Sequence, residues 1–173
     1  MNNLILCGFM GCGKTTVGRL VAQLAGMAYL DLDQQIEAAA GLPIPEIFAR
    51  FGQAHFRRLE HEAVAGLARL ENRVVATGGG ALVSPENAAA IDRKHDRVVF
   101  LDVPFPVCYE RIRLSDRPLV RQNTVEQLEA LFAARRPRYL AAATDTVAAA
   151  GPPQQVAQEI LALAARPPAT LRK

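Results

Sequence analysis

Residues 8–16 read GFMGCGKTT and directly follow the apolar run 4–7. The pattern G-x-x-x-x-G-K-T is typical of a loop that cradles phosphate groups, because backbone N–H groups point into its concave turn and the next helix adds the positive end of its dipole. Lys14 can then reach the outer phosphates, and the Thr15 hydroxyl can hold a magnesium ion. An apolar strand pattern precedes the stretch and an amphipathic helix pattern follows it, which a plain glycine-rich turn would not require. We therefore predict that this loop binds a nucleotide.

The composition is that of one globular domain. The chain has 173 residues, of which 50% are hydrophobic, which is enough to bury a core in a single domain that we expect over residues 1–165. No apolar stretch approaches membrane-spanning length, and no basic leader followed by an apolar run and a cleavage site is present. Cys7, Cys12 and Cys108 are odd in number and lack metal-type spacing, which suits a reducing compartment. We expect a cytoplasmic protein without a membrane partner. Cys12 is either a reactive thiol or, as we favour, a small loop residue.

The positive charge is concentrated in one segment of the chain. The net charge is only +3, but one segment holds many arginines and few acids, namely Arg111, Arg113, Arg117, Arg121, Arg135, Arg136 and Arg138. Such a cluster could bind nucleic acid, yet aromatic residues are scarce and none is interleaved with the arginines for base stacking. Phosphates and a carboxylate explain the cluster equally well. We favour a small-molecule site and expect no nucleic acid partner.

Strand and helix patterns alternate along the chain. Runs rich in Val, Ile, Leu and Phe predict strands at Asn3–Cys7, Ala28–Leu30, Arg73–Ala76, Arg97–Val103 and Asp145–Ala148. Helix patterns lie near 15–25, 34–40, 44–51, 53–70, 85–93, 105–112, 125–134 and 154–165. Ser84 before Pro85, and Thr124 with Gln127, predict helix starts. The alternation indicates a three-layer α/β/α fold with a central five-stranded parallel sheet and the nucleotide at the carboxyl ends of the strands.

Two polar segments do not belong to the sheet or the core. Residues 113–123, RLSDRPLVRQN, lie between two helix patterns and contain a proline. We predict a mobile lid over the phosphates, with an ordinary surface loop as the alternative. The tail 166–173, RPPATLRK, predicts disorder.

Acidic residues follow the second predicted strand. In Asp31-Leu32-Asp33, strand alternation would point both carboxylates to one side, near the phosphate loop. One could orient magnesium-bound water, and the other could accept the proton of an acceptor hydroxyl. The alternative is structural, since Asp33 could instead be the first-turn acid of the following helix.

Two further patterns indicate an anionic acceptor. Arg57 and Glu60 are three apart on a helix, so the glutamate could hold the guanidinium for bidentate capture of a carboxylate, or the two could form a surface ion pair. After the third strand, Thr77 is followed by Gly78, Gly79 and Gly80. Three glycines are conformationally expensive and indicate backbone that approaches a ligand closely, with a flexible loop as the alternative.

Together these residues resemble the shikimate kinase family. The stretch 31–60, DLDQQIEAAAGLPIPEIFARFGQAHFRRLE, is similar to the family's D-x-D-x-x-I-E, G-x-x-I-x-E-I-F and F-R-x-x-E blocks in order and spacing. The triple glycine, the R-P-L element from Arg117 and the R-x-P-x-Y element from Arg135 also match. The resemblance covers about residues 3–165. It implies a monomer that uses ATP to phosphorylate the 3-hydroxyl of shikimate, a step in making aromatic amino acids.

The resemblance also implies roles for individual residues. The ATP phosphates would be cradled by Gly11, Cys12, Gly13, Lys14, Thr15 and Thr16. Thr15 would coordinate Mg²⁺, and Asp31 would contact it through water. Asp33 would bind the substrate hydroxyls and is the candidate base. The carboxylate would be held by Arg57, Arg135 and the backbone around Gly79 and Gly80. Arg117 would reach ATP from the lid and, with Lys14 and Mg²⁺, surround the charge on the moving phosphoryl group.

Three departures and three rival functions accompany this resemblance. The lid is one residue shorter than other family forms between Arg111 and Arg117, which leaves open whether Arg111 or Arg113 serves the adenine side. No arginine stands at 151–153, and the family's G-E pair before F-R reads G-Q here. The rivals are a gluconate kinase of the same fold, a nucleoside monophosphate kinase, and a nucleotide-regulated or inactive binding protein.

Overall fold

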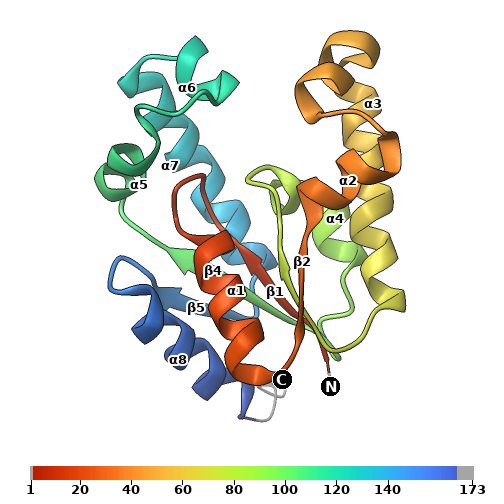
Figure 1. Ribbon diagram of the computed structural model, residues 1–173. Helices are drawn as coiled ribbons and strands as arrows, with labels where there is room; N and C mark the ends of the chain where they lie inside the picture. Colours follow the sequence, from red (N-terminus) through yellow and green to blue (C-terminus); the bar gives the residue numbers. More distant parts are fainter. Residues whose placement is uncertain (1, 167–173) are drawn as a thin grey trace.

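Five strands form the central sheet, in the order β2-β3-β1-β4-β5, and every neighbouring pair is parallel. The computed structural model describes residues 2–166 (Figure 1). The strands are β1 Leu4–Cys7, β2 Ala28–Asp31, β3 Arg73–Ala76, β4 Arg97–Asp102 and β5 Asp145–Ala148. The helices are α1 Lys14–Ala25, α2 Leu32–Ala40, α3 Ile44–Gly66, α4 Pro85–Ala90, α5 Phe105–Ile112, α6 Pro118–Gln122, α7 Val125–Ala142 and α8 Pro153–Ala164, with 3₁₀ turns η1 Leu67–Arg69 and η2 Ala81–Val83. The predicted parallel α/β fold is confirmed.

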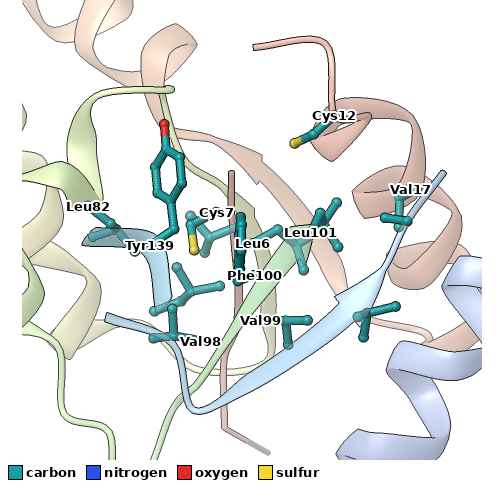
Figure 2. Packing of buried hydrophobic residues seen from close by; sticks show 14 of the residues in the cluster. Leu6, Cys7, Cys12, Val17, Leu82, Val98, Val99, Phe100, Leu101 and Tyr139 are labelled. Carbon is teal, nitrogen blue, oxygen red and sulfur yellow. The ribbon is translucent and has the colours of Figure 1, made fainter. Parts of the chain in front are cut away.

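The main core lies on both faces of the sheet. Strand β1 is central, and Ile5, Leu6 and Cys7 are fully buried, as expected for a parallel strand covered on both sides. Helices α1 and α8 pack together on one face, and α7 contacts β4 and α4 on the other. Figure 2 shows the strand side chains, including Leu6 and Val99, at the centre of this cluster. The core therefore fixes the carboxyl ends of β1, β3 and β4 relative to one another.

Helices α2 and α3 have a small core of their own. Ile36, Ile47 and Phe56 form a cluster separate from the main core. Gly52 has φ 80° and ψ 174°, so it breaks α3 into two parts, as the separate predicted helices 44–51 and 53–70 require. In Figure 1 this segment, 32–51, rises on one side of the carboxyl edge, while α6 lies on the other.

Some helix boundaries differ from the prediction. Helix α7 continues to Ala142 instead of ending at 134, although Pro137 lies inside it. An interior proline costs about 3 kcal/mol, and the burial of Leu128, Tyr139 and Ala142 on the same helix offsets that cost. The predicted lid contains α6, which begins at Pro118 and has Arg117 at its N-cap position. The starts at Ser84 and Thr124 are confirmed, the latter with a full capping box.

The carboxyl edge of the sheet collects the predicted functional segments. The phosphate loop follows β1, Asp31 ends β2, the triple glycine follows β3, and Asp102 ends β4. A cavity of about 260 Å³ lies at the opposite edge, between the start of β1 and the ends of α1 and α8, and none of the predicted site residues lines it. Within residues 2–166, no helix combines the length and the apolar character needed to cross a membrane. Of the predicted tail, 167–173 lie outside the described residues.

Candidate active site

The phosphate loop requires glycine for its backbone conformation. Gly8, Gly11 and Gly13 all have positive φ, at 145°, 82° and 98°, where other L-residues are strained. Gly11 also packs tightly, because a Cβ there would lie 2.6 Å from the Cys108 carbonyl oxygen. Gly13 is the N-cap of α1, so the loop opens directly onto the helix N-terminus. This places backbone donors and the helix dipole at one point, as a phosphate cradle needs.

Lys14 lies against the loop that precedes it. Its Nζ donates to the Gly8 carbonyl at 2.7 Å and to the Phe9 carbonyl at 3.1 Å, and lies 3.5 Å from Cys12 Sγ. Neutral backbone carbonyl groups thus hold the ammonium at the concave turn, and phosphate oxygens can compete with them because they are charged acceptors. Cys12 is buried, which favours the small loop residue over the reactive thiol, because buried thiols are inert.

Arg111 contacts the phosphate loop directly. Its Nη1 donates to the Gly11 carbonyl at 3.0 Å from the end of α5. Arg113 instead pairs with Glu110 on the protein surface. Of the two arginines that the sequence left open, only Arg111 therefore reaches the nucleotide loop. The sequence carried no signal for this, because the contact spans one hundred positions.

The acidic residues after β2 are arranged differently from the prediction. Strand alternation does not apply, because Leu32 already begins α2. Asp31 is the helix cap, and its Oδ1 accepts from the N–H groups of Asp33 and Gln34 at 3.1 and 3.2 Å. Asp33 is the acidic residue in the first turn of α2, which confirms the alternative that the sequence offered for this residue. The turn of the helix still brings both carboxylates to the carboxyl edge.

Tyr29 links Asp31 to the phosphate loop. Its hydroxyl donates to Asp31 Oδ2 at 3.4 Å. Burial and the Asp31 carboxylate raise the pKa of Tyr29, and the neighbouring Thr15 hydroxyl lowers it. The Thr15 hydroxyl and the Asp31 carboxylate are therefore both within reach of one phenol group. This is a set of hard oxygen donors that suits Mg²⁺, which usually takes one or two protein ligands and completes its shell with phosphate and water.

No protein cage for a metal accompanies these donors. Among the described residues, no three His, Cys, Asp or Glu side chains cluster so as to hold an ion. A metal at this edge would therefore depend on a bound nucleotide for most of its ligands.

Asp33 occupies the space beside Gly78. A Cβ on Gly78 would lie 2.6 Å from Asp33 Oδ1, so any side chain there would displace the carboxylate. Burial raises the pKa of Asp33 from 3.8 to about 6, with further increases from Asp31 and Glu60 and a decrease from Lys14. The carboxylate is thus ionised at neutral pH and titrates close to it, which suits a proton acceptor.

Arg57 is held by a buried glutamate. Its Nη1 donates to Glu60 Oε1 at 2.7 Å, and the Glu60 side chain is only 3% exposed whereas that of Arg57 is 39% exposed. The pair is therefore not a surface ion pair, and a buried charge-assisted bond fixes the guanidinium. A Cβ on Gly80 would lie 3.0 Å from Arg57 Nη1, so the guanidinium fills the space beside that glycine.

Arg135 and Tyr139 reach the middle glycine from α7. The Tyr139 hydroxyl donates to the Gly79 carbonyl oxygen at 2.5 Å, and Arg135 Nη1 lies 3.5 Å from the same oxygen. Asp33, Arg57 and Arg135 thus lie against Gly78, Gly80 and Gly79, in that order. The three side chains come from α2, α3 and α7 and meet at one loop.

The arginines of the lid and of α7 differ in their partners. Within residues 2–166, the exposed Arg117 side chain forms no hydrogen bond or ion pair, whereas Arg121 pairs with Asp116. Arg136 makes a two-point contact with Asp102, at 3.1 and 2.6 Å. Three of the seven arginines of the cluster, Arg113, Arg121 and Arg136, are therefore neutralised by local acids, and Arg117 remains free to contact an added anion.

Comparison with known proteins identifies the family. A family profile described as Shikimate kinase matches residues 10–165. The chain belongs to the shikimate kinase family. It is 44% identical over 163 residues to a shikimate kinase of Salinispora arenicola, covering 93% of this chain and 96% of that one. It is 46% identical over 141 residues to one of Geobacter metallireducens, with coverages of 80% and 78%.

Solved shikimate kinases have the same architecture. The enzyme from Acinetobacter baumannii, described in complex with shikimate, superposes with a TM-score of 0.87 at 36% identity and covers 95% of this chain and 93% of its own. A gluconokinase from Sinorhizobium meliloti 1021 gives a TM-score of 0.61 at 17% identity, covering 93% of this chain and 90% of its own. That second similarity shows only that the fold is shared beyond shikimate kinases.

Proposed function

We propose that the protein transfers the γ-phosphoryl group of ATP to the 3-hydroxyl of shikimate, giving shikimate 3-phosphate and ADP for aromatic amino acid biosynthesis. One observation carries the proposal: Asp33, Arg57 and Arg135 lie against three consecutive glycines beside the phosphate loop. One carboxylate and two guanidiniums around a half-buried backbone loop suit a small molecule that carries both hydroxyls and a carboxylate. Membership of the shikimate kinase family supports the same substrate.

The donor side binds ATP through the phosphate loop. Backbone N–H groups from Gly11 to Thr16 and the Lys14 ammonium hold the β- and γ-phosphates. The Thr15 hydroxyl and, through water, the Asp31 carboxylate would hold Mg²⁺, which would supply neutralisation of phosphate charge. Lys14 leaves the carbonyls of Gly8 and Phe9 for the phosphate oxygens, which are far stronger acceptors for an ammonium group.

The acceptor side binds the carboxylate and the hydroxyls of shikimate at different groups. Arg57, held by Glu60, and Arg135 bind the carboxylate together with the backbone around Gly79 and Gly80. Asp33 accepts a hydrogen bond from the substrate hydroxyls. The arginines fix the ring at one end and so place the reacting hydroxyl at the other, next to the phosphate loop.

The transfer step needs little covalent help from the protein. The 3-hydroxyl oxygen forms a bond to the γ-phosphorus, and the bond from that phosphorus to the β,γ-bridging oxygen breaks, so that ADP leaves with that oxygen. The hydroxyl proton passes to Asp33, which is ionised above a pH of about 6. Lys14 and Arg117 stabilise the charge on the moving group, and closure of the lid, 113–123, excludes water as a competing acceptor.

The chain carries all of these groups in one domain, 1–165, and we propose that it acts as a monomer in the cytoplasm. The arginine cluster needs no nucleic acid to explain it, because local acids neutralise Arg113, Arg121 and Arg136.

A coupled ADP-release assay with ATP and Mg²⁺ tests the proposal. Shikimate, gluconate and no acceptor are compared under identical conditions. We expect turnover with shikimate alone. Turnover with gluconate would retain the nucleotide site but overturn the acceptor assignment, and ATP binding without turnover would indicate a regulatory or inactive protein.

A further inference from the structure

The triple-glycine loop has no side chains with which to hold itself in place. Thr77, Asn87 and Tyr139 supply buried polar groups around it. Thr77 Oγ1 donates to the Leu6 carbonyl at 2.9 Å before the glycines, and Asn87 Nδ2 donates to the Ala81 carbonyl at 2.8 Å after them. Among these three, only Tyr139 bonds to a glycine of the loop itself, at the Gly79 carbonyl.

Tyr139 is built rigidly into the core. It is 1% exposed and stacks on Phe100 with ring centroids 5.4 Å apart. In Figure 2 its hydroxyl oxygen points away from the hydrophobic cluster in which the ring is packed. Burial raises the pKa of the phenol further above its usual value, so the hydroxyl stays protonated and able to donate at neutral pH. The ring is therefore a fixed support that presents a hydrogen-bond donor to the loop.

The Gly79 carbonyl belongs to the same peptide group as the Gly80 N–H. The structure has no cis peptide bond among its described residues, so in this planar group the N–H points opposite to the carbonyl. Fixing the Gly79 oxygen from α7 therefore fixes the direction of the Gly80 N–H on the other side of the loop. Under the proposed function, that N–H faces the substrate carboxylate.

The same carbonyl is also within reach of Arg135. Arg135 and Tyr139 are one helical turn apart on α7, and Arg135 Nη1 lies at the long distance of 3.5 Å from the oxygen that Tyr139 binds closely. Without the tyrosine hydroxyl, the guanidinium would be the remaining donor to this carbonyl. It would move toward the carbonyl and away from the acceptor site.

We propose that Tyr139 is a positioning residue for the acceptor carboxylate, which it serves by fixing the Gly79–Gly80 peptide and by leaving Arg135 free for substrate. This inference rests on the proposed function. The hydroxyl touches no reacting atom, so its loss acts on shikimate binding and leaves the chemical step and the ATP site in place.

Steady-state kinetics of Tyr139→Phe test the proposal, because the change removes one oxygen and keeps the ring on Phe100. We expect KM for shikimate to rise about ten-fold, the effect of one lost buried hydrogen bond, with kcat and KM for ATP within about two-fold. Tyr109→Phe is the matched control, since Tyr109 lies on α5 and its hydroxyl has no hydrogen-bond partner in 2–166. Ile160→Val, in the buried face of α8, controls for a general loss of stability.

The outcomes separate this inference from the proposed function. If wild type does not turn over shikimate, the proposed function fails. If wild type is active and Tyr139→Phe has the same KM for shikimate, or if Ile160→Val raises that KM equally, the positioning role is wrong. In an Arg135→Ala background we expect Tyr139→Phe to raise KM by less than in wild type, and full additivity would contradict the proposed competition for the carbonyl.

A measurement on the wild-type sequence covers the case in which Tyr139→Phe does not fold. The chain has three tyrosines, so ¹⁹F spectra of protein labelled with 3-fluorotyrosine can be assigned with Tyr29→Phe and Tyr109→Phe. We expect the Tyr139 signal to shift saturably with shikimate and to stay in place with ATP alone. A signal that is insensitive to shikimate would overturn the proposal.

Discussion

The phosphate loop and the triple-glycine loop both use runs of glycine, for different physical reasons. In the phosphate loop, Gly8, Gly11 and Gly13 adopt positive φ that other residues reach only with strain. None of Gly78, Gly79 and Gly80 has positive φ. Two of these glycines are required because functional side chains occupy the space of a Cβ, Asp33 beside Gly78 and Arg57 beside Gly80. The first loop depends on backbone shape and the second on room for neighbouring side chains.

This difference divides the site into two parts that should respond differently to mutation. Changes in the phosphate loop alter backbone geometry and so affect nucleotide binding and stability together. Changes around the triple glycine displace the ends of the Asp33 and Arg57 side chains, so they affect the acceptor and leave the fold in place. Three predictions test this division, from the largest expected effect to the smallest.

Asp33→Asn should lower kcat about 10²- to 10⁴-fold, the usual contribution of a general base, with nucleotide affinity unchanged. Whereas the substitution lowers kcat, it should raise the stability of the variant relative to wild type as the pH rises. The pKa of Asp33 in the folded protein is raised from 3.8 to about 6, so its contribution to stability is fully present below about 3.8 and is lost as the pH rises through 6. An uncharged asparagine escapes that loss. The variant's stability relative to wild type should therefore improve by roughly 1–3 kcal/mol between pH 4 and pH 8.

Denaturant unfolding at the two pH values, combined with steady-state kinetics, measures both effects of Asp33→Asn. Equal kcat for variant and parent would show that Asp33 is not the base. A relative stability that does not change with pH would show that its pKa is not raised.

Gly11→Ala should weaken nucleotide binding about 100-fold and lower the free energy of unfolding by about 3 kcal/mol, since it combines positive φ with overpacking. The added Cβ meets a backbone oxygen of Cys108 at 2.6 Å, which cannot rotate away. Gly26 also has positive φ, but a Cβ added there would have no atom within 4 Å. Gly26→Ala therefore isolates the cost of placing alanine at positive φ. Nucleotide titration and thermal unfolding of both variants give the comparison, and identical losses would mean that packing against α5 is unimportant.

Glu60→Gln should raise KM for shikimate about ten-fold, because Arg57 loses a buried charged partner. The acid limb of kcat/KM against pH should fall near pH 6 in wild type, where Asp33 titrates. Glu60 contributes to the raised pKa of Asp33, so the limb should move to lower pH in the variant. A pH–rate series on both proteins checks this, and an unmoved limb would mean that another group governs it.

The sequence predicted the fold more fully than the local geometry of the site. Apolar runs located all five strands, because a covered parallel sheet leaves that pattern in any sequence. The predicted helix ended at 134, whereas α7 continues through Pro137 to Ala142, because tertiary packing of Tyr139 outweighs a local helix breaker. The extent of this helix matters, since it places Arg135 and Tyr139 on the same glycine. Strand alternation was expected to point Asp31 and Asp33 to one side, whereas Asp31 caps α2 and Asp33 lies in its first turn, because the strand ends at Asp31, two residues before Asp33.

Contacts between residues that are far apart in the sequence could not be predicted from sequence patterns. The contacts of Arg111 with Gly11 and of Asp33 with Gly78 join residues far apart in sequence. The motifs indicated which residues matter, but not which glycine each side chain lies against. The triple glycine did signal a close approach. The structure adds that the protein side chains Asp33 and Arg57 take the Cβ space beside Gly78 and Gly80, and the approach of a ligand to this backbone stays a prediction.

The most direct test of the two-part site is Gly78→Ala, with nucleotide affinity and shikimate-dependent turnover measured on the same sample. Its Cβ would meet the end of the Asp33 side chain at 2.6 Å, so Asp33 should move while the fold is retained. Gly66→Ala, with no atom within 4 Å, is the matched control. We predict a fall of about 100-fold in kcat/KM for shikimate with unchanged nucleotide affinity. Wild-type turnover, or an equal loss of nucleotide affinity, would contradict the division of the site into two separable loops.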